Sequence, residues 1–251
     1  MKILGLDIAT NTGYCILNDG NIETYGMINI PVEMNLLQRI SFFESNIIKI
    51  LNDNNPDYIA IEDVILGASG VKTLAYLSRL NGVALNCCYK KVQNNISLYT
   101  PSEWKSNSFN GLNGLAKKYE IQLAVCKHFK LIDETILNNI CKPLETINDQ
   151  TDSIKKSIDL ISLNTKKYIA FLARKRTGPS NDSERKAFEH KIEENKKEIK
   201  ILKGQLETNK KQIDNIYKSV SLEIMSKCGL TSDVSDSIGI AYCLWKKINP
   251  L

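Results

Sequence analysis

The sequence predicts an α/β fold: a mixed five-stranded sheet flanked by helices, with a long antiparallel coiled-coil helical hairpin inserted near the end. Three observations lead to this prediction. The first 30 residues hold three short apolar runs joined by tight turns, which is typical of an antiparallel meander. Strand-like and helix-like segments then alternate to about residue 130, which favours parallel strands covered by helices. Two heptad series follow, at 140–172 and 188–220.

The first strand, residues 2–9, is a short apolar run with one carboxylate, Asp7, near its end. An acid in a buried strand requires compensation, because an unpaired buried carboxylate is costly, and a metal ion is the commonest partner. Alternatively, Asp7 caps the following turn at 9–13 through local hydrogen bonds. This segment alone leaves both interpretations open.

The remaining elements follow in order. We expect strands at 12–17 and 22–30, a helix at 36–51, a strand at 58–64, a helix at 71–92, a strand at 96–99, a helix at about 112–129 and a last helix at 232–247. A right-handed crossover places strand 58–64 beside the first strand. Asp7 and Glu62 then become neighbours at the same end of adjacent parallel strands, where open α/β sheets hold their sites.

The two heptad series mirror each other about residue 180, with turn-forming residues at 177–182 between them. Their polar members match as well: Thr165 should face Asn195, and Thr151 should face Asn209. Buried polar pairs of this kind can fix the register of a seam. We therefore predict a hairpin domain at 136–224, inserted into a sheet domain made of 1–135 and 225–251. An intermolecular coiled coil is the alternative.

The hairpin region is basic, with 18 Lys and Arg against 12 Asp and Glu between 140 and 222. Its outer third carries Lys166, Lys167, Arg174, Lys175, Arg176, Arg185 and Lys186. These side chains form either an ordinary solvated helix face or a basic arm that contacts nucleic-acid phosphates.

Composition sets further limits. The 251 residues are 43% apolar and 24% charged, as in ordinary globular proteins. No apolar run is long enough for a transmembrane helix, and the chain starts directly in a strand, so we expect no membrane association and no leader peptide. Seven cysteines without a C-x-x-C spacing suggest reduced thiols in a cytoplasmic protein. The two histidines are isolated, which argues against a histidine metal site.

Two further acids, Asp233 and Asp236, lie three residues apart on one face of the last predicted helix. Acids are common in the first turn of a helix, which is their simplest explanation. Together with Asp7 and Glu62, however, they form an all-oxygen set, which suits Mg²⁺ or Mn²⁺. Two such ions can hold an attacking water and a leaving oxygen on one phosphate.

Three short motifs occur in a characteristic order: Gly5-Leu6-Asp7 with Thr12-Gly13-Tyr14, then Ile61-Glu62-Asp63-Val64, then Asp233-Val234-Ser235-Asp236-Ser237. In this respect the chain resembles the RuvC-type Holliday-junction resolvases of the RNase H-like fold, over 1 to about 130 and 229–247. The resemblance implies that the catalytic, metal-binding acids are Asp7, Glu62, Asp233 and Asp236, with two Mg²⁺ or Mn²⁺ ions. It also implies that Lys105 and Lys117 contact DNA near the cut.

The same resemblance implies a homodimeric crossover junction endodeoxyribonuclease that cuts four-way junctions in recombination and repair, in the cytoplasm of a bacterium or a phage-infected host. Two features depart from the family. The family's aromatic wedge just after the second acid is replaced by Ile65 here, which leaves Phe109 and Tyr76 as candidates for that role. A hairpin stands where the family has a short link; it could clamp DNA arms, extend the dimer or recruit a protein partner. The alternatives are an RNA–DNA hybrid nuclease and a non-catalytic DNA-binding or scaffold protein.

Overall fold

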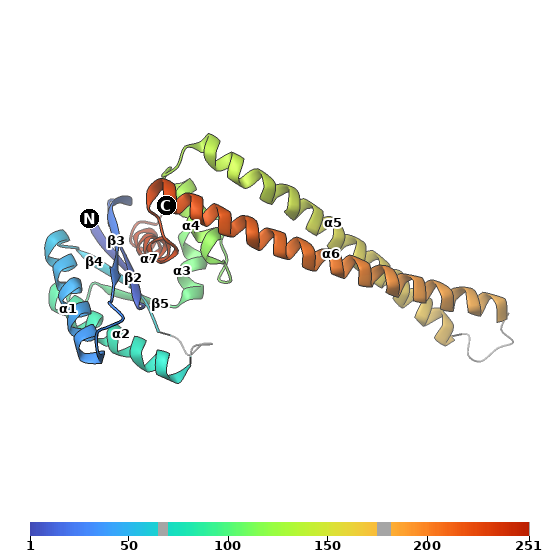
Figure 1. The fold of residues 1–251 in the computed structure, drawn as a ribbon, viewed down its shortest axis with the longest axis horizontal. Coiled ribbons are helices and arrows are strands. Elements are labelled where there is room, and N and C mark those ends of the chain that lie inside the picture. Colours follow the sequence, from blue (N-terminus) through green and yellow to red (C-terminus); the bar gives the residue numbers. More distant parts are fainter. Residues whose placement is uncertain (65–69, 175–181, 251) are drawn as a thin grey trace. The chain divides into compact units, whose positions relative to one another are not determined.

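A computed structural model describes residues 1–64, 70–174 and 182–250 of the chain (Figure 1). The chain divides into two compact units. The sheet unit comprises Met1–Glu134 and Ser221–Leu251, and the hairpin unit comprises Thr135–Val220. Within the described ranges, no helix combines the length and apolar character needed to cross a membrane.

The sheet unit contains five strands in the order β3-β2-β1-β4-β5. The strands are β1 (Lys2–Asp7), β2 (Asn11–Asn18), β3 (Asn21–Asn29), β4 (Tyr58–Glu62) and β5 (Ile96–Tyr99). The first three form the predicted antiparallel meander, and β4 and β5 extend the sheet in parallel from β1. The predicted mixed five-stranded sheet is confirmed, including the pairing of β1 with β4.

Helices cover both faces of this sheet (Figure 1). Helices α1 (Leu36–Asn54) and α2 (Val71–Val92) pack on one face, where Leu4, Leu6, Ile59 and Ile61 join their apolar residues in one core. Because side chains alternate along a strand, Asp7 and Glu62 belong to the opposite face. That face carries α7 (Ser232–Ile248), which contacts β1, β2 and β4.

Helix α7 approaches the sheet very closely at two glycines. A Cβ at Gly5 of β1 would lie 2.2 Å from the Ser237 carbonyl oxygen. A Cβ at Gly13 of β2 would lie 2.1 Å from the Asp233 carbonyl oxygen. Only glycine leaves room for such contact, so these two positions set α7 directly on the strands and bring its first turn to the end of β1.

One prediction about this unit is wrong. The expected helix from about 112 to 129 begins only at Lys118, as α4 (Lys118–His128), and an unforeseen helix, α3 (Pro101–Ser108), precedes it. Thr100 caps α3 through a capping box, and proline suits its first turn. Residues 109–117 are irregular instead, because Gly111 has a φ of +87° and the Asn113 side chain accepts a hydrogen bond from Leu115 N.

The hairpin unit is built from the long helices α5 (Glu134–Arg174) and α6 (Asp182–Cys228). Both predicted polar pairs are confirmed. Asn195 Nδ2 donates to Thr165 Oγ1 at 2.9 Å, and Asn209 Nδ2 donates to Thr151 Oγ1 at 3.3 Å. The two helices therefore pair in the mirrored register. The predicted tip at 177–182 lies outside the described residues except for Asp182, where α6 begins.

These polar pairs make an asymmetric prediction. Thr165 Oγ1 also donates to the Ile161 carbonyl oxygen, so Asn195→Leu leaves that hydroxyl hydrogen-bonded. Thr165→Val, in contrast, leaves the Asn195 amide facing an apolar seam, at an expected cost of about 1 kcal/mol. We expect lower hydrogen-exchange protection of the surrounding α5 and α6 amides in Thr165→Val and unchanged or higher protection in Asn195→Leu. Equal loss in both variants would contradict the seam geometry.

Candidate active site

Asp7 and Glu62 are the last residues of β1 and β4. The two strands pair in parallel up to Leu6 and Ile61, so the acids follow as neighbours at the same sheet edge. Both side chains are half-buried, on the face that α7 covers. The sheet thus places two carboxylates side by side, as the right-handed crossover predicts.

Helix α7 brings the other two acids to this edge. Thr231 caps the helix by accepting from Val234 N, so Asp233 and Asp236 fall in its first two turns. The contact of Gly13 with the Asp233 backbone holds this end of α7 against the β1–β2 corner. Asp236 is 6% exposed, and its Oδ1 has no hydrogen-bond partner among the described residues.

The acids act on one another electrostatically. Burial raises the pKa of Asp7 well above its usual value, and the charges of Glu62, Asp236 and Asp233 raise it further. Burial likewise raises the pKa of Asp236 to about 7, assisted by Glu62 and Asp233. Burial also raises the pKa of Glu62. The structure therefore brings all four predicted acids into one mutually repelling group.

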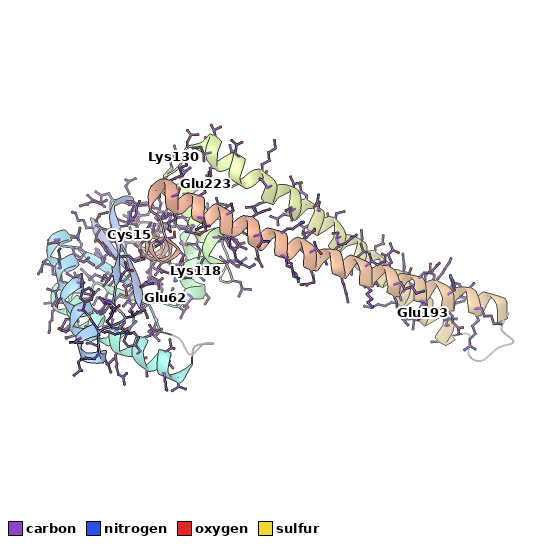
Figure 2. All side chains as sticks on the ribbon, viewed as in Figure 1. Cys15, Glu62, Lys118, Lys130, Glu193 and Glu223 are labelled. Atoms are coloured by element: carbon purple, nitrogen blue, oxygen red, sulfur yellow. The ribbon has the colours of Figure 1, made fainter. Side chains whose placement is uncertain are left out.

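Two donors partly compensate this group. Lys118 Nζ donates to Asp233 Oδ1 at 2.7 Å, and Trp104 Nε1 donates to Glu62 Oε2 at 2.7 Å. Both Lys118 and Glu62 are labelled in Figure 2. Burial lowers the pKa of Lys118, but its bond to Asp233 and the charges of Asp236 and Asp7 outweigh that effect, so the net pKa is raised. Lys118 is a cation already attracted by these acids.

The site suits a divalent cation in the chemistry of its donors. In the described ranges, no three Asp, Glu, His or Cys side chains already form a group that could hold a metal ion. The four acids are spaced apart, and their nearby positive charge is Lys118, whose side chain is 60% exposed. The unpartnered Asp236 Oδ1 and the raised pKa values show that a further positive charge would be stabilised here, and carboxylate oxygens suit Mg²⁺ or Mn²⁺.

The predicted DNA-contacting lysines differ in position. The charge of Lys105 acts on Glu62 and Asp236, so it lies near the acids. Lys117 is the N-cap residue of α4, and its Nζ lies 5.6 Å from the centre of the Tyr119 ring. The adjacent lysine, Lys118, contacts the acids. The resemblance implied Lys117 as the DNA contact and did not single out Lys118, which is the lysine that α4 brings to the acids.

The predicted basic residues of the arm belong to the hairpin unit. Lys166, Lys167 and Lys186 are exposed, and Arg185 Nε bonds Glu189 Oε1 at 3.0 Å. Lys175 and Arg176 lie outside the described residues, as does the side chain of Arg174. A role for this set stays a prediction.

The wedge candidates also have clear positions. Phe109 is only 5% exposed and packs among aromatic rings, so it does not project from the surface. Tyr76 is half-buried against the α1–α2 core, and Ile65 lies outside the described residues. Sequence reasoning also missed the role of Trp104, because no local pattern reveals that its indole reaches a strand 42 residues earlier.

The raised pKa of Asp236 gives a pH-dependent stability prediction. A carboxyl whose pKa rises on folding stabilises the fold below its unfolded value near 4 and loses that contribution as the pH rises through about 7. Without metal, Asp236→Asn should therefore match wild type at about pH 4 and melt at a higher temperature at about pH 8. Added Mg²⁺ should stabilise only wild type at pH 8. Thermal melts in EDTA and Mg²⁺ check this; a pH-independent difference would contradict it.

The chain is similar to known proteins of one family. The family model "Crossover junction endodeoxyribonuclease RuvC" matches residues 3–148. The RuvC of Dictyoglomus turgidum is 30% identical over 138 residues, or 53% of this chain and 85% of that protein. The RuvC of Finegoldia magna is 30% identical over 177 residues, which cover 67% of this chain and 98% of that protein. A solved Thermus thermophilus RuvC in complex with Holliday junction substrate has a TM-score of 0.46 and 16% identity, covering 53% of this chain and 82% of that one.

Proposed function

Since the chain belongs to the RuvC family of crossover junction endodeoxyribonucleases, we propose that it is a metal-dependent, structure-selective endonuclease that cleaves Holliday junctions and related branched DNA. One observation carries the proposal: four carboxylates from β1, β4 and α7 lie at one sheet edge, where the charges of Glu62 and Asp233 raise the pKa values of both Asp7 and Asp236. The reaction is phosphodiester hydrolysis, which leaves a 5′-phosphate and a 3′-hydroxyl. Cytoplasmic location, in a bacterium or a phage-infected host, is part of the same proposal.

Asp7, Glu62, Asp233 and Asp236 would hold the metal, which we propose to be two Mg²⁺ or Mn²⁺ ions. Bound ions of this kind supply a water of lowered pKa and positive charge at the scissile phosphate. Asp7 is perturbed by all three other acids, so it is the best candidate for a shared ligand. Lys105 and Lys118 add positive charge beside the acids, which would position a DNA phosphate there.

Trp104 should position Glu62 for metal binding. Its indole is fully buried, its N–H holds Glu62 Oε2, and Gly239 of α7 makes room for the ring, since a Cβ there would lie 2.6 Å from Trp104 Cζ3. Trp104→Phe removes the donor but keeps an aromatic ring. We expect Mg²⁺ affinity, measured by calorimetry, to fall about tenfold, as for other partners of metal-ligating carboxylates.

A control separates positioning from general destabilisation. Trp245, the other tryptophan, stacks on Tyr242 and approaches Gly20, so Trp245→Phe should leave Mg²⁺ affinity unchanged. In a Glu62→Gln background, Trp104→Phe should cause no further loss if it acts through Glu62. An additive loss in the double variant would remove the positioning role.

A homodimer fits the two-fold symmetry of a four-way junction, because symmetric cleavage needs two related sites. We propose α2 as the main interface element. Support comes from apolar side chains exposed at its two ends, Val71 (83%) and Tyr89 (59%), and from Leu37 (76%) on the adjoining α1. Sedimentation at micromolar concentration tests this, and an active monomer would exclude it.

We also propose that the 136–224 hairpin is a basic arm that contacts the phosphates of a DNA arm. The contacting residues are Lys166, Lys167, Arg174, Lys175, Arg176, Arg185 and Lys186. Lys105 and Lys117 would contact the DNA near the cut. Phosphate contacts release counterions, so deleting the arm should flatten the salt dependence of junction binding. Deleting residues 140–220 and joining residues 139 and 221 by a short linker gives the test protein, which keeps Ser221–Leu251 of the sheet unit. Unchanged binding, salt slope and cleavage would leave recruitment of a protein partner as the arm's role.

The decisive assay compares substrates. The protein with Mg²⁺ is incubated with a four-way junction, a flap, a linear duplex and an RNA–DNA hybrid. Symmetric cutting of the junction, with ligatable 5′-phosphate ends, is the expected result. Cutting of the hybrid alone would favour the RNA–DNA hybrid nuclease, and junction binding without any cutting would favour a DNA-binding scaffold.

A further inference from the structure

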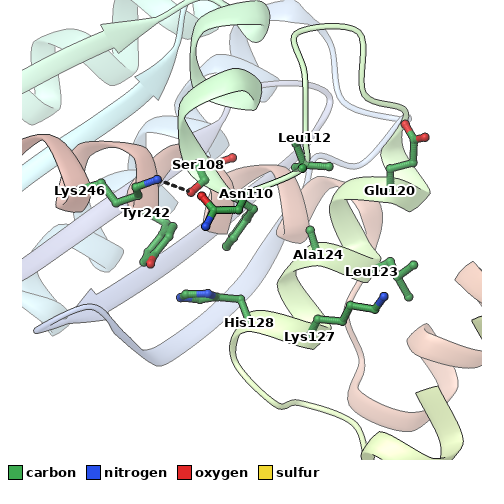
Figure 3. A pocket seen from close by; sticks show the side chains of 12 residues that line it. Ser108, Asn110, Leu112, Glu120, Leu123, Ala124, Lys127, His128, Tyr242 and Lys246 are labelled. Atoms are coloured by element: carbon green, nitrogen blue, oxygen red, sulfur yellow. Dashed lines mark hydrogen bonds between the residues drawn. The ribbon is translucent and has the colours of Figure 1, made fainter. Parts of the chain in front are cut away.

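The sheet unit contains a cavity of about 560 Å³ that no step proposed above uses (Figure 3). It lies between the end of α3, the 109–117 turn, one face of α4 and the last turns of α7. Binding sites for small organic molecules have volumes of about 300–1,000 Å³, so the cavity has room for such a ligand.

Aromatic rings form one end of this cavity. The rings of Phe109 and Tyr242 stack, with centroids 5.1 Å apart and an interplanar angle of 8°. The ring centroids of His128 and Tyr242 lie 4.5 Å apart. Figure 3 shows His128 extending from α4 toward Tyr242 and Asn110. Burial and the charge of Lys246 lower the pKa of His128, which favours the neutral form of its ring. A neutral imidazole can stack on a planar group and hydrogen-bond it.

A polar group in the cavity wall lacks its partner. Ser108 is fully buried and lines the cavity, and its Oγ has no hydrogen-bond partner in the described part of the chain. Buried hydroxyls are nearly always hydrogen-bonded, because an unmade bond is costly. Because this oxygen is itself buried, the hydroxyl lies behind the surface of the cavity and offers no open contact to a ligand.

The charges of the cavity favour an anion. Lys127 and Lys246 line it against a single acid, Glu120. Among the described residues, Lys246 Nζ makes only one long hydrogen bond, of 3.4 Å to the Ser108 carbonyl oxygen, so most of its donor capacity is open to a ligand. Lysine ammonium groups at a cavity rim are common partners of phosphate.

We propose that this cavity binds a nucleoside monophosphate unit, with the base against the exposed ring of His128 and the phosphate at Lys246 and Lys127. The exposed Asn110 amide is available for the polar edge of the base or sugar. The same chemistry has two sources: an unpaired nucleotide of a DNA strand, or a free nucleotide. The strand source rests on the proposed nuclease function, whereas binding of a free nucleotide does not.

The cavity is close enough to the candidate active site for a strand to reach it. Trp104 of α3 bonds Glu62, and Ser108 lies four residues further along the same helix. At a rise of about 1.5 Å per residue, Trp104 and Ser108 are about 6 Å apart along the helix axis. Along α7, Tyr242 lies six residues after Asp236, or about 9 Å. A duplex strand advances about 3.4 Å per nucleotide, so the two sites are a few nucleotides apart.

The first test uses free ligands and needs no cleavage. Deoxyadenosine monophosphate, deoxyadenosine and inorganic phosphate are titrated into the full chain, with amide resonances of 108–110, 127–128 and 242–246 observed by NMR. The monophosphate should shift them in a saturable way and bind more tightly than either part. Lys246→Ala should weaken it about tenfold, the usual effect of losing a charge-assisted hydrogen bond. Lys247→Ala is the matched control, because Lys247 lies over the Tyr99 ring and does not line the cavity.

The second test fills the cavity and distinguishes the sources. Ala124→Trp should block nucleotide binding, and His128→Ala replaces it if that variant does not fold. Four-way junctions carry 2-aminopurine at each of the three nucleotides flanking the cut and are bound without metal. A fluorescence rise that Ala124→Trp abolishes assigns the cavity to a strand nucleotide; an unchanged signal with saturable free binding assigns it to a free nucleotide. Phosphate binding as tightly as the monophosphate, or no saturable shift and no aminopurine response, would overturn the proposal.

Discussion

Replacing Asp7 with Asn is expected to lower the rate of junction cleavage by about a thousandfold while leaving junction binding intact. Asp7 ends β1 and is the acid whose pKa all three other carboxylates raise, so it lies at the centre of the group. Asparagine has nearly the same shape but no charge. Loss of about 4 kcal/mol of transition-state stabilisation, within the several kcal/mol that a metal supplies, corresponds to that factor.

Asp63→Asn is the matched control for this variant. Asp63 follows Glu62 directly, but its charge is not among those that perturb Asp7, and its backbone N–H bonds the Tyr99 carbonyl oxygen. Single-turnover cleavage in Asp63→Asn should stay within about twofold of wild type. Wild-type rates in Asp7→Asn, or equal losses in both variants, would show that Asp7 is no metal ligand.

The largest expected effect on stability comes from Gly5→Ala. The new Cβ would lie 2.2 Å from the Ser237 carbonyl oxygen and 2.8 Å from Ala241 Cβ, neither of which can rotate away. Helix α7 would have to move off the sheet, at a cost of about 3 kcal/mol, the upper end for overpacked sites. For a domain of this size the melting temperature should fall by about 6–12 °C.

The same variant should lose activity as well, because Asp233 and Asp236 move with α7. Gly204→Ala gives the contrast: a Cβ added at this helical glycine of α6 would meet nothing within 4 Å, so alanine should be neutral or slightly stabilising. Calorimetry and cleavage assays measure both effects. A Gly5→Ala protein with wild-type melting would mean that the contact between β1 and α7 is loose enough to admit a methyl group.

The regular part of the fold could be predicted from local patterns. Strand alternation, helical periodicity and the crossover rule were enough to pair β1 with β4 and so to place Asp7 beside Glu62. The heptad symmetry was enough to pair Thr165 with Asn195. In each case the information repeats at a fixed spacing, so a short segment carries it.

The irregular part could not be predicted in the same way. The break between α3 and α4 depends on one glycine with positive φ, Gly111, and on one side-chain turn at Asn113. That break decides which of two adjacent lysines, Lys117 or Lys118, meets the acids. The Trp104–Glu62 bond depends on how closely α3 packs on Gly239. Such contacts come from tertiary packing, which no sequence spacing encodes.

The insertion of the hairpin has a consequence for the order in which the chain folds. Half of the acids follow the hairpin in sequence, so a nascent chain that ends before α7 has a sheet with one uncovered face and no complete acid group. Closing a loop of that length without structure would be entropically unfavourable. An antiparallel pair of helices forms through local contacts, and its two ends lie close together. Early pairing of α5 with α6 would therefore shorten the effective loop and speed the docking of α7.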